Sequence, residues 1–370
     1  MNNNYNNTDT LTLSINNDEF IADLELDLST QTATQKTDQN SEICAVVNKV
    51  KICEHNLEAE NKKYLNCNFC NQKLDVAKLP NLTKFHCPAC NKTITITLDF
   101  ANFTLLEIIG IGGMAVVYKA FDNDLKRNVA IKILNESLIT KENHKLLFLK
   151  EAQMAARLNH SSIMPIFAFN KHEKKYYIVM PFMDQGSLKS KIYKKQFSQA
   201  EKMVHYKKIL HWMLEITEGL VYSLRHGIVH HDIKPGNILL DKYENAHLCD
   251  FGLAQFFKSV SHNNLSPQFW LSPHYTSPEK VMYRREDYRG DIYSLGATFY
   301  HLLAGSPPFH SNNIDGLITA RFEQNPKNIR HYNKTVSRKI AKLISQMLNI
   351  QPNNRPEYSE IILVLSQELI

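Results

Sequence analysis

The sequence predicts an α+β chain of two lobes, preceded by a small metal-binding segment and a polar N-terminal tail. Three observations lead to this prediction. Strand-like stretches dominate from Phe103 to Phe182, helix-like stretches dominate after Phe182, and two C-x-x-C pairs lie upstream of both. A short β-rich part followed by a longer helical part implies two lobes, because each kind of element must bury its apolar face.

Composition and charge narrow the class of protein. The chain has 370 residues, of which 43 % are apolar and 22 % are charged, as in ordinary globular proteins. Seven acidic residues and one base give residues 1–40 a net charge of −6, so the remainder carries +12 within the total of +6. A basic body suits anionic ligands such as nucleotide phosphates.

No apolar run reaches the ~18 residues of a membrane span. The N-terminus also lacks the basic start and apolar stretch of a secretory signal, so we expect no membrane span and a cytoplasmic protein.

The first 62 residues are expected to contain no folded domain. Residues 1–40 are rich in Asn, Thr, Gln and Asp, and we expect them to be mostly disordered because they offer little apolar surface for a core. Apolar and acidic residues alternate at 20–28. The alternation either arises by chance in a solvated tail or indicates a strand that docks on a sheet edge. Residues 41–62 are interpreted as a linker, with Cys44 and Cys53 outside any metal site.

Residues 63–98 carry a pattern typical of a zinc site. The pairs CNFC (67–70) and CPAC (87–90) are sixteen residues apart, and two residues between cysteines let a tight turn aim both thiolates at one ion. We expect a short β-hairpin to hold two such turns around structural zinc, and the segment resembles the zinc-ribbon family. The alternative is four free thiols in a linker. The predicted zinc ligands are Cys67, Cys70, Cys87 and Cys90.

The predicted ribbon is expected to act as a spacer or to dock a protein. Its net charge of +4 over residues 61–100 permits contact with nucleic acid. Few aromatic residues are arranged for base stacking, so nucleic acid is not the expected partner. A closed four-cysteine site leaves no open coordination position, which excludes zinc catalysis there.

The elements of the two lobes follow from periodicity. FTLLEIIGIGG, AVVYKAF, NVAIKIL and KKYYIVMPF are predicted strands. Between the third and fourth of these, apolar residues at Phe148, Ala152, Ala155 and Leu158 have helical spacing. A long helix ending near Gly227 is predicted from an apolar face formed by Ile209, Met213, Ile216, Leu220 and Leu224.

Five motifs follow one another in a diagnostic order. They are GIGGMA (110–115), VAIK (129–132), HHDIKPGN (230–237), DFG (250–252) and SPE (277–279). From Phe103 to Ile370 the chain therefore resembles bacterial members of the eukaryotic-like Ser/Thr protein kinase family. The resemblance implies the bilobal protein-kinase fold, with a β-rich N-lobe, an α-helical C-lobe and ATP between them. It also implies transfer of the γ-phosphoryl group of ATP to Ser or Thr hydroxyls of protein substrates.

The resemblance assigns roles to individual residues. Lys132 would contact the α/β-phosphates and pair with Glu151 on the following helix, while Val117 would pack on the adenine. The base would meet the backbone after Met180, at Pro181 and Met183. The full set of implied ATP-binding positions is Gly110, Gly112, Gly113, Val117, Ala130, Lys132, Met180 and Met183.

The same resemblance places the phosphoryl-transfer chemistry on four residues. Asp232 would orient the substrate hydroxyl and accept its proton, and Lys234 would neutralise the γ-phosphate. Asn237 and Asp250 would hold Mg²⁺ or Mn²⁺. Structural roles are implied for Glu279 with its ion-pair partner Arg355, and for Asp291 beneath the catalytic loop.

Four positions depart from the family pattern. Ala115 replaces the last glycine of the nucleotide loop, for which we expect a slightly stiffer lid. Leu271 and Ser272 stand where relatives often show Gly-Thr, and Ser272 keeps a hydroxyl within expected reach of Asp232 and Lys234. His231 replaces the arginine with which many relatives grip a phosphorylated activation loop. We therefore expect activity that does not depend on that phosphorylation.

Two other functions remain open from the sequence. One is a pseudokinase scaffold that recruits partners through its zinc ribbon. The other is a nucleic-acid-binding regulator that uses the ribbon and the basic surface. Because Lys132, Glu151, Asp232, Asn237 and Asp250 are all present, an active kinase is the favoured interpretation.

Overall fold

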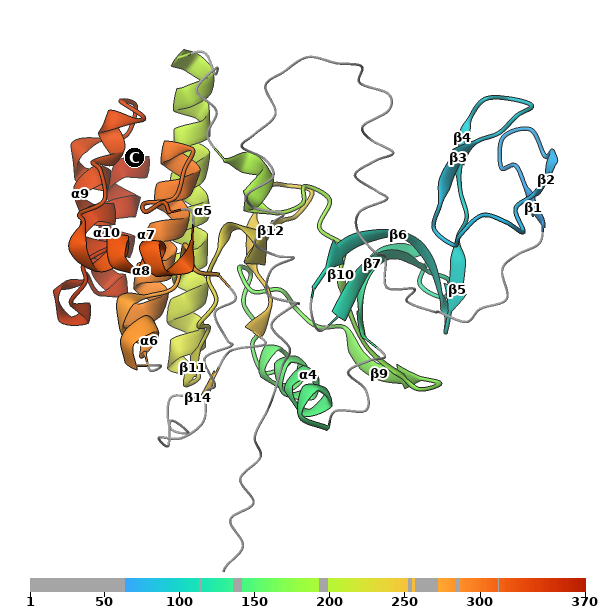
Figure 1. Cartoon of the computed structure of the whole chain (residues 1–370), viewed down its shortest axis with the longest axis horizontal. Coiled ribbons are helices and arrows are strands. Elements are labelled where there is room, and N and C mark those ends of the chain that lie inside the picture. The colour runs from blue at the N-terminus through green and yellow to red at the C-terminus, as the bar shows by residue number, and fades with distance from the viewer. Residues whose placement is uncertain are drawn as a thin grey trace, which may run out of the picture. The chain divides into compact units, whose positions relative to one another are not determined.

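The computed structural model describes residues 64–112, 115–135, 142–192, 199–251, 255–256, 272–283, 286–311 and 313–370 (Figure 1). The expected tail (1–40) and linker (41–62), with Cys44 and Cys53, lie outside the described residues. Gly113, Leu271 and the side chain of Glu151 lie outside them as well.

Four short strands form two separate antiparallel hairpins around the cysteines. Each hairpin encloses one C-x-x-C pair in its turn, and leucine, valine and isoleucine side chains pack with Cys67 and Cys87 in a small buried cluster. The expectation of a single hairpin that holds both turns is therefore wrong, because each cysteine pair closes a hairpin of its own. The strands are β1 (Tyr64–Asn66), β2 (Lys73–Asp75), β3 (Lys84–His86) and β4 (Thr93–Thr95).

A six-stranded antiparallel sheet follows, in the order β5-β6-β7-β8-β10-β9. The four strands predicted for this part of the chain are confirmed as β6, β7, β8 and β10. The sequence did not predict the first strand, which adds to the outer edge of the sheet and packs the Phe100 ring 5.1 Å from the Tyr177 ring. The strands are β5 (Leu98–Phe100), β6 (Phe103–Ile111), β7 (Ala115–Asp122), β8 (Arg127–Leu134), β9 (Ala168–His172) and β10 (Lys175–Pro181).

One helix, α4 (Glu142–Ala155), packs on this sheet. Phe148 and Ala152 are buried together with Leu134 of β8 and Ile178 of β10. The helical spacing of apolar residues predicted this contact, which is confirmed.

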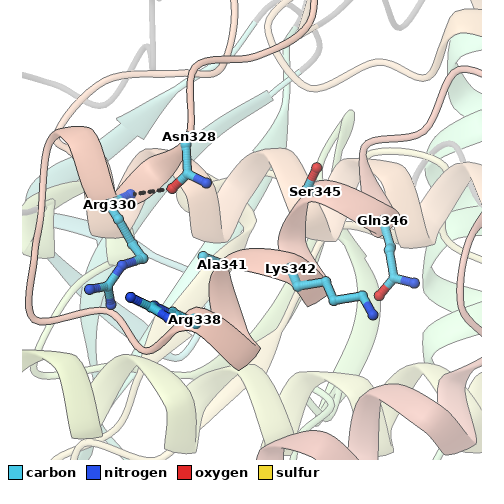
Figure 2. Close-up of a pocket in the computed structure, with 7 residues that line it drawn as sticks. All are labelled: Asn328, Arg330, Arg338, Ala341, Lys342, Ser345 and Gln346. Atoms are coloured by element: carbon cyan, nitrogen blue, oxygen red, sulfur yellow. Dashed lines mark hydrogen bonds between the residues drawn. The ribbon is translucent and has the colours of Figure 1, made fainter.

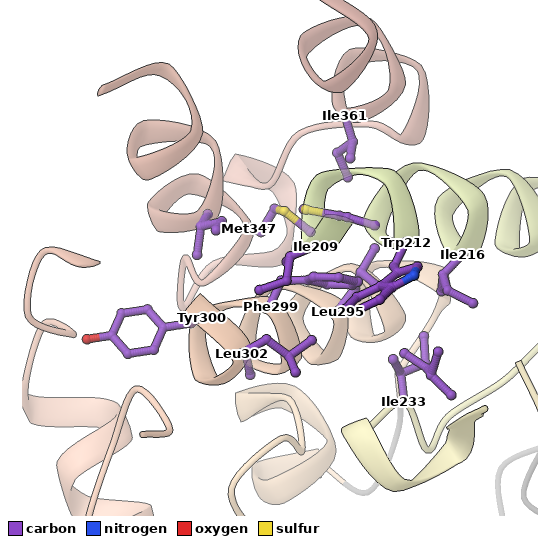
Figure 3. Close-up of a cluster of buried hydrophobic side chains, with 14 of the residues drawn as sticks. Ile209, Trp212, Ile216, Ile233, Leu295, Phe299, Tyr300, Leu302, Met347 and Ile361 are labelled. Atoms are coloured by element: carbon purple, nitrogen blue, oxygen red, sulfur yellow. The ribbon is translucent and has the colours of Figure 1, made fainter. Parts of the chain in front are cut away.

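The C-terminal part is helical and is built around α5 (Gln199–Arg225). That helix packs against α7 (Tyr288–Ala304) and α10 (Tyr358–Leu369), and α7 packs against α9 (Arg338–Met347). Figure 3 shows how Ile209, Trp212 and Ile216 of α5 meet Leu295 and Phe299 of α7. The apolar face predicted for the long helix is confirmed, because its residues form the centre of this core.

Shorter elements connect these helices and carry the loops between them. They are η1 (Leu188–Lys191), β11 (Ile228–Val229), η2 (Pro235–Asn237), β12 (Ile238–Leu240), β13 (Ala246–Leu248), β14 (Gln255–Phe256), α6 (Pro278–Tyr283), α8 (Ile314–Glu323), η5 (Ile329–His331) and η6 (Pro352–Asn354). No helix in the described part of the chain combines the length and the apolar character that crossing a membrane requires.

Candidate functional site

The four cysteines converge on one point. Their sulfur atoms all lie within 4.8 Å of one another, with 3.6 Å between Cys67 and Cys90 and 3.7 Å between Cys70 and Cys87. Four sulfur ligands at about 2.3 Å from a central ion, at the corners of a tetrahedron, would lie about 3.8 Å apart. The cluster therefore has the dimensions of a tetrahedral thiolate site.

The two cysteine turns have the same backbone geometry. In the first, Cys67 N–H donates to Gln72 and Asn71 N–H donates back to Cys67. In the second, Cys87 and Asn91 make the equivalent bonds. Asn71 and Asn91 both adopt the left-handed region, with φ of 61° and 57°, which asparagine tolerates better than most residues. Each turn thus directs its two thiols toward the point where the four sulfur atoms meet.

The strand register gathers the predicted nucleotide-binding positions on one face of the large sheet. Val117 lies opposite both Gly110 and Lys132, and Met180 lies opposite Ala130. Residues paired across strands share a face, as do residues two apart on one strand. These five positions therefore face the same side, which is also the side covered by α4.

Two further predicted positions, Gly112 and Met183, closely follow strands β6 and β10. Gly112 N–H donates to the Ala115 carbonyl and closes the turn between β6 and β7. The Ala115 methyl group is buried against Leu134 and Phe148, so the residue that departs from the glycine pattern anchors the start of β7. Met183 is buried just beyond β10.

Lys132 and Asp250 meet although they are 118 positions apart in the chain. The Lys132 ammonium lies 2.5 Å from Asp250 Oδ1, and the lysine side chain is largely buried while the aspartate side chain is 45 % exposed. Asp250 adopts a left-handed backbone with φ of 70°, a conformation that costs about 1 kcal/mol or more in a non-glycine residue. The strained turn directs the exposed carboxylate toward the lysine.

The loop from His230 to Asn237 concentrates three predicted residues. Asn237 Nδ2 donates to both the backbone oxygen and Oδ2 of Asp232, each at 2.9 Å. Lys234 Nζ lies 3.1 Å from the same carboxylate oxygen and donates to Ser272 Oγ at 2.9 Å. One oxygen of Asp232 is thus held by an amide and an ammonium group.

Asp291, in the first turn of α7, fixes the backbone that precedes Asp232. Its two carboxylate oxygens accept the N–H groups of His230 and His231 at 2.8 and 2.7 Å. The His230 imidazole contacts the Cys249 carbonyl at 3.0 Å and lies edge-on to Phe251, 4.6 Å between ring centroids. Burial lowers the pKa of His230 and raises that of Asp291, while the neighbouring histidines oppose the rise at Asp291.

Glu279 and Arg355 form a bidentate ion pair. The two guanidinium nitrogens lie 2.6 and 2.7 Å from the two carboxylate oxygens, and the arginine side chain is fully buried. The remaining donors of Arg355 bond the carbonyls of Arg289, Asn349 and Ile350. The end of the segment that carries Ser272 is thereby fastened to the helical core.

A separate pocket of about 300 Å³ lies between η5 and α9. Figure 2 shows Arg330, Arg338 and Lys342 around it, together with Asn328. None of the residues predicted for nucleotide binding or phosphoryl transfer lines this pocket.

The structure also adds two residues that sequence reasoning missed. Glu286 and Lys280 both contact the catalytic loop at His231. From the sequence, His231 was notable only because it replaces the arginine of the family pattern. A glutamate and a lysine flanking a turn are ordinary surface residues in sequence. No sequence pattern marks them for burial, because the close approach of Gly290 to Glu286 appears only in the structure.

Comparison with known proteins decides the family. Residues 103–364 match the protein kinase domain family. The chain belongs to the protein kinase family. This match confirms the predicted bilobal fold, and together with the bacterial serine/threonine-protein kinases to which the chain is similar it confirms the assignment to bacterial-type Ser/Thr kinases. Membership implies ATP and Mg²⁺ or Mn²⁺ as ligands of the kinase domain.

Three curated relatives are serine/threonine-protein kinases from bacteria. PrkC of Bacillus subtilis is 32 % identical over 260 residues, which are 70 % of this chain and 39 % of the relative. PknD of Protochlamydia amoebophila is 28 % identical and PknB of Mycolicibacterium smegmatis is 29 % identical. These matches cover 78 % and 68 % of this chain, and 32 % and 40 % of the relatives. The chain thus spans less than half the length of each.

Proposed function

We propose that the chain is a Ser/Thr protein kinase that transfers the γ-phosphoryl group of ATP to hydroxyls of protein substrates. The contact between Lys132 and Asp250 carries this proposal. It joins the sheet face that holds the predicted nucleotide positions to the loop segments that hold Asp232, Lys234 and Asn237. Phosphoryl transfer consists mainly of positioning and charge neutralisation, and this arrangement supplies both.

Asp232 is the proposed general base. Asn237 and Lys234 hold its Oδ2, so Oδ1 is the atom that accepts the hydrogen bond, and then the proton, of the substrate hydroxyl. Lys234 is placed to neutralise charge on the transferred phosphoryl group. Its bond to Ser272 Oγ sets the direction of the ammonium group.

Asn237 and Asp250 are the proposed magnesium ligands. Asn237 uses its amide nitrogen for both bonds to Asp232, so its amide oxygen is the atom left for a cation. The Asp250 side chain is 45 % exposed, and Mg²⁺ prefers oxygen ligands. When bound, the ion neutralises charge on the nucleotide phosphates.

The sheet face of β6, β7, β8 and β10 is the proposed nucleotide site. Val117, Ala130 and Met180 offer apolar surface to the adenine, and Lys132 offers its ammonium group to the phosphates. The roles of Glu151 and Gly113 follow from the resemblance alone. Glu279, Arg355 and Asp291 are proposed as structural supports.

Mass spectrometry of the chain and of a basic protein substrate after incubation with Mg·ATP tests the proposal. We expect phosphoserine or phosphothreonine in the wild type and none with Asp232→Asn, which keeps the size of the side chain and removes the base. Tight ATP binding without transfer in the wild type would instead favour the scaffold function.

We further propose that Cys67, Cys70, Cys87 and Cys90 hold one structural zinc ion. The support is the sulfur spacing, which is close to the ~3.8 Å of a tetrahedral Zn–thiolate site. The buried cluster around the cysteines is small, so the metal would supply much of the folding free energy. The exposed Phe69, between the first two ligands, is the proposed point of contact for a protein partner.

A further inference from the structure

A buried carboxylate contacts the catalytic loop at His231, the residue before Asp232. Glu286 precedes α7, and only 3 % of its side chain is exposed. Its Oε1 lies 2.9 Å from His231 Nδ1 and 2.9 Å from Lys280 Nζ, while Oε2 accepts the Ser277 hydroxyl at 2.5 Å. Three side chains from two segments therefore fix one carboxylate.

The first turn of α7 is shaped to receive this carboxylate. Gly290 lies so close that a Cβ atom there would stand 2.1 Å from Glu286 Oε2 and 2.6 Å from Cδ, a distance that no side chain tolerates. Any residue larger than glycine at position 290 would drive the carboxylate away from His231. The absence of a side chain at Gly290 thus leaves the space that the Glu286 carboxylate occupies.

His231 is restrained through its backbone N–H, its backbone carbonyl and its Nδ1. Its N–H donates to Asp291, its carbonyl accepts from Lys280 Nζ at 2.6 Å, and its imidazole meets Glu286. It also holds a left-handed backbone with φ of 69°, a conformation that persists only where the surroundings over-determine it. Asp232 is the next residue, so the position of the general base depends on these restraints.

Glu286 and Lys280 are both charged at neutral pH. Burial alone would raise the pKa of Glu286, but Lys280 and the bond with His231 lower it to about 2. Burial opposes the charge of Lys280, and Glu286 nevertheless raises the pKa of that lysine. Asp291 and Asp232 add two further carboxyl groups near Lys280. A full negative charge therefore faces His231 without any phosphate.

We propose that Glu286 is a positioning residue, a built-in carboxylate that holds His231 and through it the catalytic Asp232 in working geometry. The inference rests on the proposed kinase function and extends it. This role explains why a histidine can replace the arginine at position 231. The anion that the His231 imidazole contacts is Glu286, which is part of the fold and is present without activation-loop phosphorylation.

Steady-state kinetics of the full chain, treated with phosphatase beforehand, test the role. Glu286→Gln keeps the shape and removes the charge, whereas Glu218→Gln makes the same change at an exposed position of α5. We expect kcat to fall at least tenfold for Glu286→Gln with an unchanged KM for ATP, and both constants to stay at wild-type values for Glu218→Gln.

A double variant distinguishes positioning from a general loss of stability. Glu286 acts through His231, so His231→Ala with Glu286→Gln should be no slower than His231→Ala alone. Gly290→Ala, which displaces the carboxylate sterically, should reproduce the loss of kcat and provides a second variant if Glu286→Gln does not fold. The positioning role of Glu286 would be refuted if the fold-losses in kcat of the two single variants multiplied in the double variant. It would also be refuted if Glu286→Gln and Glu218→Gln had equal kcat.

Hydrogen exchange separates this inference from the kinase proposal. Without substrate, amides of residues 228–234 should exchange at least tenfold faster in Glu286→Gln than in Glu218→Gln. Faster exchange in Glu286→Gln, combined with no phosphate transfer by the wild type, would leave the positioning role intact and refute the kinase function. Unchanged exchange in an active enzyme would refute the positioning alone.

Discussion

The ion pair between Glu279 and Arg355 gives a quantitative prediction about stability. Glu279→Gln removes the counter-ion of a guanidinium group whose side chain is fully buried. Breaking a buried pair by removing one partner costs about 3–5 kcal/mol. The carbonyls of Arg289, Asn349 and Ile350 continue to accept from Arg355, and the Gln oxygen replaces one acceptor. We therefore expect the lower end of that range, about 3 kcal/mol.

In a domain of this size, about 3 kcal/mol corresponds to a decrease in Tm of roughly 6–12 °C. Circular dichroism at 222 nm against temperature measures it, with Glu218→Gln as the matched control at an exposed position. Replacing both partners by apolar residues, Glu279→Leu with Arg355→Met, should recover most of the lost stability because no unpaired charge remains. A Tm for Glu279→Gln within 2 °C of the control, or a double variant as unstable as the sum of the single ones, would refute the reasoning.

Three other outcomes are expected. Cys67→Ser combined with Cys87→Ser should lower bound zinc from about one equivalent to none by plasma mass spectrometry, and metal retained at one equivalent would contradict the proposed site. Ser272→Ala should reduce kcat about tenfold, because a hydrogen bond from a charged donor contributes about 1.5 kcal/mol, whereas Ser272→Thr should retain activity. The carboxyl of Glu286 has its pKa lowered from 4.5 to about 2, so it stabilises the fold above pH 4.5, and that contribution is lost as the pH falls toward 2. Urea titrations should show the wild type losing about 3 kcal/mol more than Glu286→Gln over that interval, and parallel curves would contradict it.

Local patterns predicted much of the fold. The apolar face of α5 is visible in the sequence because the helix repeats its period over 27 residues. Strands β6, β7 and β8 are visible as strand-like runs of eight or nine residues, the first two joined by a glycine turn. The convergence of the four cysteines was also predictable, since each pair is held by one short turn. Strand β5 was not, because three residues show no clear period and their place depends on pairing with β6.

The candidate site was also predictable from the sequence only in part. Lys132, Asp232, Asn237 and Asp250 could be named because their motifs have fixed internal spacing and order. Glu286 could not be found from sequence. Its burial depends on a neighbouring glycine and on Lys280, and its partner His231 lies 55 positions away.

The strand β5 has a practical consequence for how the kinase domain can be divided from the rest of the chain. The family match begins at Phe103, but the sheet begins at Leu98. A polypeptide cut at position 103 would expose the hydrogen-bonding groups of β6 as a bare edge and would lose the Phe100 ring from its place beside His172 and Tyr177. Such a truncated kinase should self-associate, so the boundary for independent expression belongs before Leu98.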